Sequence, residues 1–163
     1  MKVVKVFKEN KQFTLFSILA LIVVGVAVFA PQIAPYDPLD AVMLESLQAP
    51  SSAHPFGTDK LGRDLLSRVI FGTRTSLVMT LCLVAVIFVI GTFLGVIAGY
   101  FGGIVDGVIM RIADMMISFP GLVLAIAIAG MLGPNLVNAV ISIAAVSWTK
   151  YARLARSMVL RVK

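Results

Sequence analysis

Few residue types in this sequence are suited to catalysis. The single histidine, His54, precedes Pro55 and has no second histidine or nearby cysteine with which to form a metal site. Ser67 and Ser76 have no histidine available as a general base. The single cysteine, Cys82, lies in an apolar run and cannot form an internal disulfide. The loop Gly-x-x-x-x-Gly-Lys-Ser/Thr, which binds nucleotide phosphates, is absent. We therefore expect no catalytic residue, no metal site and no bound cofactor.

The composition indicates a membrane protein. Of the 163 residues, 60% are hydrophobic and 13% are charged, whereas a soluble domain is typically about 45–50% apolar and about 25% charged. Residues 12–36, 75–105 and 115–149 contain no Asp, Glu, Lys or Arg. A helix needs about 20 apolar residues to cross about 30 Å of hydrocarbon. These runs exclude a soluble enzyme and predict an all-α, polytopic membrane helix bundle.

The uncharged runs predict about four transmembrane helices. The third run is too long for one crossing, and Gly133-Pro134-Asn135 supplies a break within it. Pro120 is expected to kink the helix that precedes this break. The predicted spans are residues 13–30, 77–98, 115–132 and 136–149.

Two of these spans have alternatives. The alternative for the first span is a cleaved signal peptide. Its apolar segment, however, is longer than the apolar core of a typical signal peptide, which has about 7–15 residues. The fourth is short enough for a re-entrant segment. The basic residues favour four full crossings, because Lys and Arg are enriched on the cytoplasmic side of a membrane. With four spans, the inner side carries Lys2, Lys5, Lys8, Lys11, Arg111, Lys150, Arg153, Arg156, Arg161 and Lys163, and the outer side carries Lys60, Arg63, Arg68 and Arg74. Without the fourth span, the outer side would carry more basic residues than the inner side. We therefore expect four spans with both termini cytoplasmic.

The net charge of +6 does not by itself indicate nucleic-acid binding. The basic residues lie at the edges of the apolar runs, where they orient a membrane protein. No basic stripe is interleaved with aromatic residues, as a nucleic-acid surface would require. We expect contact with lipid and none with nucleic acid.

Small residues recur at helical spacing in two of the predicted spans. Such faces let helix backbones approach closely, and close contact drives helix association in lipid. We expect these faces to pack within the chain's own bundle, and the alternative is that one lines a partner subunit or a transport path. The residues are Gly91, Gly95 and Gly99 in the second span and Gly121, Ala125 and Ala129 in the third.

Charged residues flank the second and third spans. Arg111 and Asp114 are three residues apart, so they share a helix face at the predicted cytoplasmic entrance to the third span, where we expect an ion pair. In residues 62–74, apolar side chains fall on one side of a helix and charged or polar side chains on the other. This pattern predicts an amphipathic helix that lies along the outer interface before the second span. The alternative is a charged lead-in that only anchors that span.

Residues 54–68 read His-Pro-Phe-Gly-Thr-Asp-Lys-Leu-Gly-Arg-Asp-Leu-Leu-Ser-Arg. With the segments 99–103, 110–114, 119–121, 133–134 and 151–154, this motif resembles the permease subunits of peptide/nickel-type ABC importers, in particular the second, C-type permease of the pair. The resemblance covers nearly the whole chain. Its motif residues in the outer segment are Gly57, Thr58, Asp59, Gly62, Arg63, Asp64, Ser67 and Arg68.

The resemblance implies a transport role without catalysis by this chain. Its implied partners are a second homologous permease subunit, two ATPase subunits and an extracytoplasmic solute-binding protein. Residues 1–58 would hold the cytoplasmic tail, the first span and an outer loop, and residues 59–163 the first part of the permease core. The family's Glu-Ala-Ala…Gly coupling signature is not reached before Lys163, so we expect a chain that stops short of the coupling loop and the last spans.

Two other classes of protein remain as rivals. A small accessory membrane protein would assemble through its glycine faces without transporting anything. A proton-coupled transporter would normally carry ionisable residues at mid-membrane, and the predicted spans have none at their centres. The motifs do not distinguish among dipeptide, oligopeptide and nickel as substrate.

Overall fold

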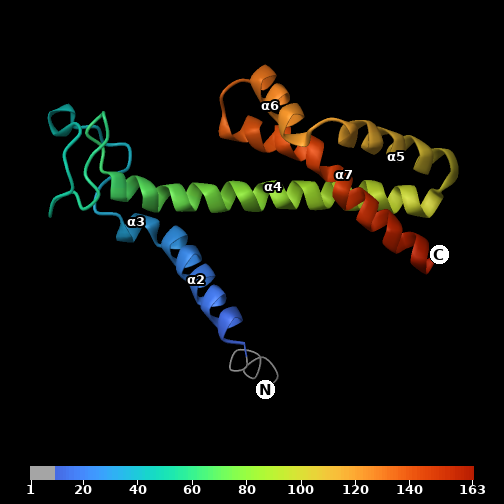
Figure 1. The fold of residues 1–163 in the computed structure, drawn as a ribbon, viewed down its shortest axis with the longest axis horizontal. Coiled ribbons are helices and arrows are strands. Elements are labelled where there is room, and N and C mark those ends of the chain that lie inside the picture. The colour runs from blue at the N-terminus through green and yellow to red at the C-terminus, as the bar shows by residue number, and fades with distance from the viewer. Residues whose placement is uncertain (1–9) are drawn as a thin grey trace. The chain divides into compact units, whose positions relative to one another are not determined.

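The computed structural model describes residues 10–163, and in that range the regular elements are helical apart from one isolated bridge between Thr58 and Asp64. The predicted all-α fold is confirmed. The chain forms two compact units, Met1–Val78 and Met79–Lys163, and helix α4 passes from the first into the second (Figure 1).

The first unit begins with α2 (Lys11–Val28), which contains most of the predicted first span. A short helix, α3 (Ala30–Ile33), follows, and Pro31 lies in its first turn, where a missing backbone N–H disrupts no hydrogen bond. Within α2 only Ala27 is buried. A helix that is apolar all round and unburied by its own chain is suited to lipid. The single-turn helix η1 (Met43–Glu45) lies in the loop that leads to α4.

Helix α4 (Leu65–Phe101) joins the predicted amphipathic segment and the predicted second span without a break. The expectation of a separate helix along the outer interface at residues 62–74 is therefore wrong. No proline occurs between Leu65 and Phe101, so no missing donor ends the helix at the edge of the apolar run. With 37 residues, α4 is about 55 Å long, which exceeds the hydrocarbon thickness of a bilayer.

In the second unit the chain turns at Gly102 and Gly103, which have φ of +65° and +52°, into α5 (Gly103–Ser118). After Phe119 and Pro120, α6 (Gly121–Leu132) follows with a bend of 93° between the two helices. The expectation of one kinked helix over residues 115–132 is therefore wrong. Proline cannot donate within a helix, and here it separates two helices rather than bending one.

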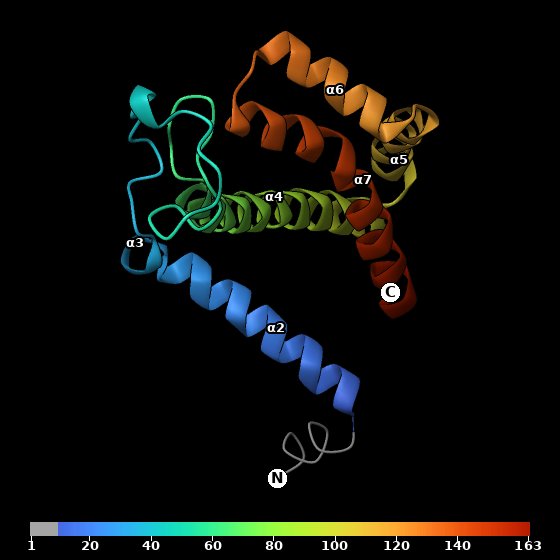
Figure 2. The same ribbon diagram turned by 60° about the vertical axis from the view of Figure 1, so that its left-hand side comes forward.

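The last helix, α7 (Leu136–Val162), begins at Asn135, whose side chain accepts a hydrogen bond from Val137 N at 2.9 Å. The predicted fourth span, residues 136–149, is only its first half. This half runs beside α6 in the opposite direction (Figures 1 and 2).

Within residues 10–163, α2 and α4 are long and apolar enough to cross a membrane, and the bent pair α5–α6 makes a third crossing if it is counted as one span. Helix α7 is not among them, because its apolar part ends at Thr149 and Lys150 follows. The polytopic architecture is confirmed, with two or three crossings on this measure rather than four.

Candidate functional site

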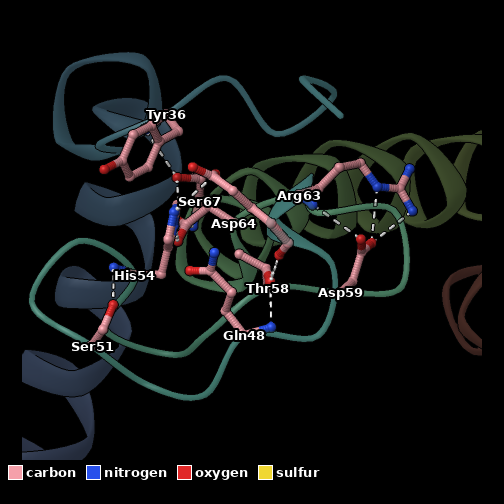
Figure 3. A network of polar contacts seen from close by, with 10 residues as sticks. Tyr36, Gln48, Ser51, His54, Thr58, Asp59, Arg63, Asp64 and Ser67 are labelled. Carbon is pink, nitrogen blue, oxygen red and sulfur yellow. Dashed lines mark hydrogen bonds and ion pairs between the residues drawn. The ribbon is translucent and has the colours of Figure 1, made fainter. Parts of the chain in front are cut away.

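Asp64 lies at the centre of a buried polar network at the start of α4 (Figure 3). Its Oδ2 accepts hydrogen bonds from both the backbone N–H and the hydroxyl of Ser67, each at 2.7 Å. Its Oδ1 lies 3.0 Å from His54 Nδ1. Because Asp64 precedes the first residue of α4, its carboxylate acts as the N-cap of that helix. One side chain therefore starts the helix and also anchors the loop that carries His54.

His54 is buried, with 6% of its surface exposed. Its Nε2 lies 3.4 Å from Glu45 Oε2, and its ring packs against Tyr36 with the centroids 4.9 Å apart. The sequence did not predict these partners, because the expectation for His54 concerned only histidine and cysteine as neighbours. A buried imidazole needs a hydrogen-bond partner. Asp64 supplies one at Nδ1, and the carboxylate of Glu45 lies at ion-pair distance from Nε2.

This arrangement does not activate Ser67 as a nucleophile. The carboxylate of Asp64 lies between His54 and Ser67, and the Ser67 hydroxyl donates to that carboxylate while it accepts from Tyr36 N at 3.1 Å. An activated serine would donate to the histidine instead. Across residues 10–163 no group of three or more His, Cys, Asp or Glu side chains is placed to hold a metal ion. The network can therefore position a loop, and it shows no arrangement for bond chemistry.

Asp59 forms a second centre in the same loop. Its Oδ1 accepts from the backbone N–H groups of Leu61 and Arg63 at 2.8 and 3.1 Å. Its Oδ2 lies 2.9 Å from Arg63 Nε, 2.8 Å from Arg63 Nη2 and 3.1 Å from Arg68 Nη1. The side-chain hydrogen bond from Arg63 lowers the pKa of Asp59 from 3.8 to about 2, against the opposing effect of burial. One carboxylate therefore joins the loop to the first turn of α4.

The two aspartates predict a loss of stability in acid. Burial alone would raise the pKa of Asp64, but hydrogen bonds from Ser67 and His54 outweigh it, so that pKa is also lowered. A carboxylate with a lowered folded-state pKa stabilises the fold above its unfolded value of about 4. That contribution is lost as the pH falls from there towards 2, the folded pKa of Asp59.

We expect the thermal midpoints of the parent and of Asp59→Asn to differ most above about pH 4 and to converge near pH 2. Far-ultraviolet circular dichroism of the chain in detergent measures both. Asp40→Asn removes an exposed carboxylate from the same loop and should show little difference at any pH. A gap between Asp59→Asn and the parent that stays constant over this range would refute the assignment.

Two glycines in the motif occupy positions that exclude a side chain. Gly57 and Gly62 have φ of +74° and +75°, in the left-handed region. A Cβ on Gly57 would lie 2.4 Å from Gln48 O, and one on Gly62 would lie 1.8 Å from Val42 O. Only glycine satisfies both the backbone conformation and the close approach of the preceding loop.

Thr58 lies between these glycines and is 4% exposed. Its hydroxyl accepts from Gln48 N at 2.9 Å and donates to Glu45 O. Thr58 also forms the isolated bridge with Asp64. The structure thus brings all the predicted motif residues together in the loop before α4 and the first turn of that helix. We call this group the loop network: Gly57, Thr58, Asp59, Gly62, Arg63, Asp64, Ser67 and Arg68 together with Glu45 and His54.

In the second unit, α4 contacts α7 through three glycines. A Cβ on Gly91 would lie 2.6 Å from Trp148 O, and one on Gly95 would lie 2.2 Å from Ala152 O. A Cβ on Gly99 would lie 2.8 Å from Val159 Cβ. These distances are far below van der Waals contact, so the two backbones approach as closely as small-residue packing permits. We call this surface the glycine contact.

The second predicted face of small residues lies on α6. Ala125 is buried and Ala129 is half-buried, and a Cβ on Gly121 would lie 3.5 Å from Val146 Cγ1 of α7. This is an ordinary contact distance, so Gly121 is less tightly enclosed than the glycines of α4. Beside it, a cavity of about 430 Å³ lies between α6 and α7 and reaches Phe119, Ser147 and Lys150.

Ion pairs connect α5 to α7. Arg156 binds Asp106 through two hydrogen bonds of 2.5 Å, and Arg153 pairs with Asp114. The expected pair between Arg111 and Asp114 is therefore not formed. Because α5 packs against α7, Asp114 has a cation available across the helix contact, whereas Arg111 is exposed and pairs with no carboxylate among the described residues.

Comparison with known proteins covers both units. Residues 91–163 match the family model of the binding-protein-dependent transport system inner membrane component. Residues 2–50 match the model of the N-terminal TM domain of oligopeptide transport permease C. The chain belongs to the C-type permease family of peptide and nickel importers. The segment between the two models, which carries most of the loop network, is included in pairwise matches to members of this permease family.

Three relatives illustrate the range of this permease family. The chain is 41% identical over 162 residues to the probable D,D-dipeptide transport system permease protein DdpC of Escherichia coli K12, a match that covers 99% of this chain and 54% of the relative. It is 39% identical over 163 residues to the dipeptide permease DppC of Haemophilus influenzae (96% and 55%). It is 38% identical over 149 residues to the nickel permease NikC of Escherichia coli K12 (89% and 54%). The chain spans about half the length of the curated relatives it matches.

Proposed function

We propose that this chain serves as a membrane-spanning subunit of an ABC importer and forms part of the path for a peptide, nickel or a related small solute. The observation that carries the proposal is its similarity, over nearly all of its length, to permeases named for dipeptide, glutathione and nickel transport. Helices α2 and α4, which are long and apolar enough to cross a membrane, support the location of such a subunit there.

Its proposed partners are a second homologous permease, two ATPase subunits and an extracytoplasmic solute-binding protein. In this arrangement α2 and α4 cross the membrane, and the bent pair α5–α6 enters it and returns with the first half of α7. Both termini then lie on the cytoplasmic side and the loop network lies on the outer side. The excess of Lys and Arg at the two ends of the chain supports this orientation. ATP binding and hydrolysis on the partner subunits would favour one of two bundle states over the other.

Co-purification and uptake together test the proposal. A tagged copy of the chain, expressed in its host, should co-purify a second permease and an ATPase. Deletion of its gene should lower uptake of labelled dipeptide, glutathione or nickel ion, and the affected solute identifies the substrate class. Partners recovered without any change in uptake of these solutes would favour an accessory role. Recovery of neither ATPase nor permease would refute the proposal.

A further inference from the structure

The two arginines of the loop network carry more charge than their carboxylate partner neutralises. Arg63 and Arg68 both bind Oδ2 of Asp59, so the cluster retains one net positive charge. Neither Arg63 Nη1 nor Arg68 Nη2 has a hydrogen-bond partner among residues 10–163. Arginine donors arranged in this way are suited to a phosphate or a carboxylate.

These arginines line a pocket of about 330 Å³ in the first unit. From Arg68 the pocket follows one stripe of α4 through Phe71, Gly72 and Thr75, at helical spacing i, i+3, i+4 and i+7. Leu39, from the loop before the network, lines the pocket as well. The pocket thus has cationic donors at one end and mainly apolar lining at the other.

The position of this pocket along α4 matches the edge of a membrane. Arg74 is the last charged residue before the uncharged run 75–105. Arg68 precedes Thr75 by two turns of helix, which is about 10 Å. Basic side chains at this level of a spanning helix commonly reach the lipid headgroups, while the apolar turns that follow contact acyl chains.

We propose that this pocket binds an anionic phospholipid, with the headgroup phosphate on Arg63 and Arg68 and the start of an acyl chain along Phe71 and Thr75. A free phosphate ion shares the headgroup chemistry but gains nothing from the apolar end. The pocket is therefore a lipid site that links the loop network to the bilayer, in addition to any part that this subunit has in transport.

Lipid binding to the full chain in detergent, counted by native mass spectrometry, tests this assignment. Titration with palmitoyl-oleoyl phosphatidylglycerol should give a bound lipid at lower concentration than titration with the matching phosphatidylcholine. Arg68→Gln should weaken phosphatidylglycerol binding about fivefold. Arg74→Gln is the matched control, since it removes the same charge from the same helix outside the pocket, and it should leave the affinity close to that of the parent.

A second variant blocks the pocket without changing its charge. No atom lies within 4 Å of where a Cβ on Gly72 would stand, so Gly72→Phe should fold, fill the pocket and weaken phosphatidylglycerol binding. Equal losses for Arg68→Gln and Arg74→Gln would overturn the proposal, as would equal binding of both lipids. Competition by inorganic phosphate at concentrations similar to the lipid would show a free-anion site and overturn it as well.

Discussion

Gly95→Leu is expected to separate α4 from α7 and to lower the stability of the second unit by about 3 kcal/mol. The first atom of the new side chain would lie 2.2 Å from Ala152 O and 2.8 Å from Ala155 Cβ. Ala152 is fully buried and lies beside Trp148 and Ala113, so its backbone cannot move without disturbing the small core between α5 and α7. The thermal midpoint of the chain in detergent, followed by circular dichroism, measures the loss.

The matched control is Gly130→Leu. Gly130 is also a helical glycine in the second unit, but no atom lies within 4 Å of where its Cβ would stand. Leucine there should leave the midpoint close to that of the parent. If both substitutions lower the midpoint equally, the loss comes from bulk in an apolar helix and not from the glycine contact. Trp148, the one tryptophan of the sequence, lies at the same contact beside Gly91 and reports on it through its fluorescence.

Asp64→Ala is expected to release the loop network and to cost about 3 kcal/mol. The substitution removes the N-cap of α4, which is worth about 1 kcal/mol. It also leaves the buried His54 Nδ1 and Ser67 hydroxyl without their carboxylate, and a buried polar group that loses its partner costs about 1–3 kcal/mol. Trypsin should then cut after the exposed Lys60 much faster than in the parent, which gel electrophoresis of timed digests measures.

Asp40→Ala is the control for this experiment. It removes an exposed acidic side chain from the same loop, and the cleavage rate at Lys60 should stay near that of the parent. Asp64→Asn, which keeps an acceptor oxygen for Ser67, should give an intermediate rate. Cleavage of Asp64→Ala at the rate of the parent would mean that Asp64 does not hold the loop.

The membrane character and the helical class could be predicted because they depend on the length and apolarity of continuous segments. Most of α2 lies in the uncharged run 12–36, and most of α4 lies in the uncharged run 75–105. The prediction of a separate amphipathic helix over residues 62–74 was wrong for a physical reason. Charge marks where lipid begins, whereas a helix ends where its backbone loses a donor or a cap, and Asp64 supplies the cap ahead of the charged turns.

Contacts between distant residues could not be predicted. Asp114 and Arg153 are 39 residues apart, and their pairing depends on how α5 packs against α7. His54 and Asp64 are closer in sequence, but the turns at Gly57 and Gly62 that bring them together leave no periodic signal. The glycine spacing in α4 predicted a face capable of close approach, and only the packing identifies α7 as the helix that it meets.

The bend between α5 and α6 has a consequence for solvation of the main chain. The C-terminal end of a helix leaves up to four carbonyl groups without intrahelical donors. At the end of α5, the Ser118 hydroxyl donates a hydrogen bond to one of them, Met115 O. Hydrocarbon offers no donor to the others. The cavity beside Phe119 is also lined by two residues with polar side chains, Ser147 and Lys150. In a bilayer this corner therefore has to be wet or covered by protein.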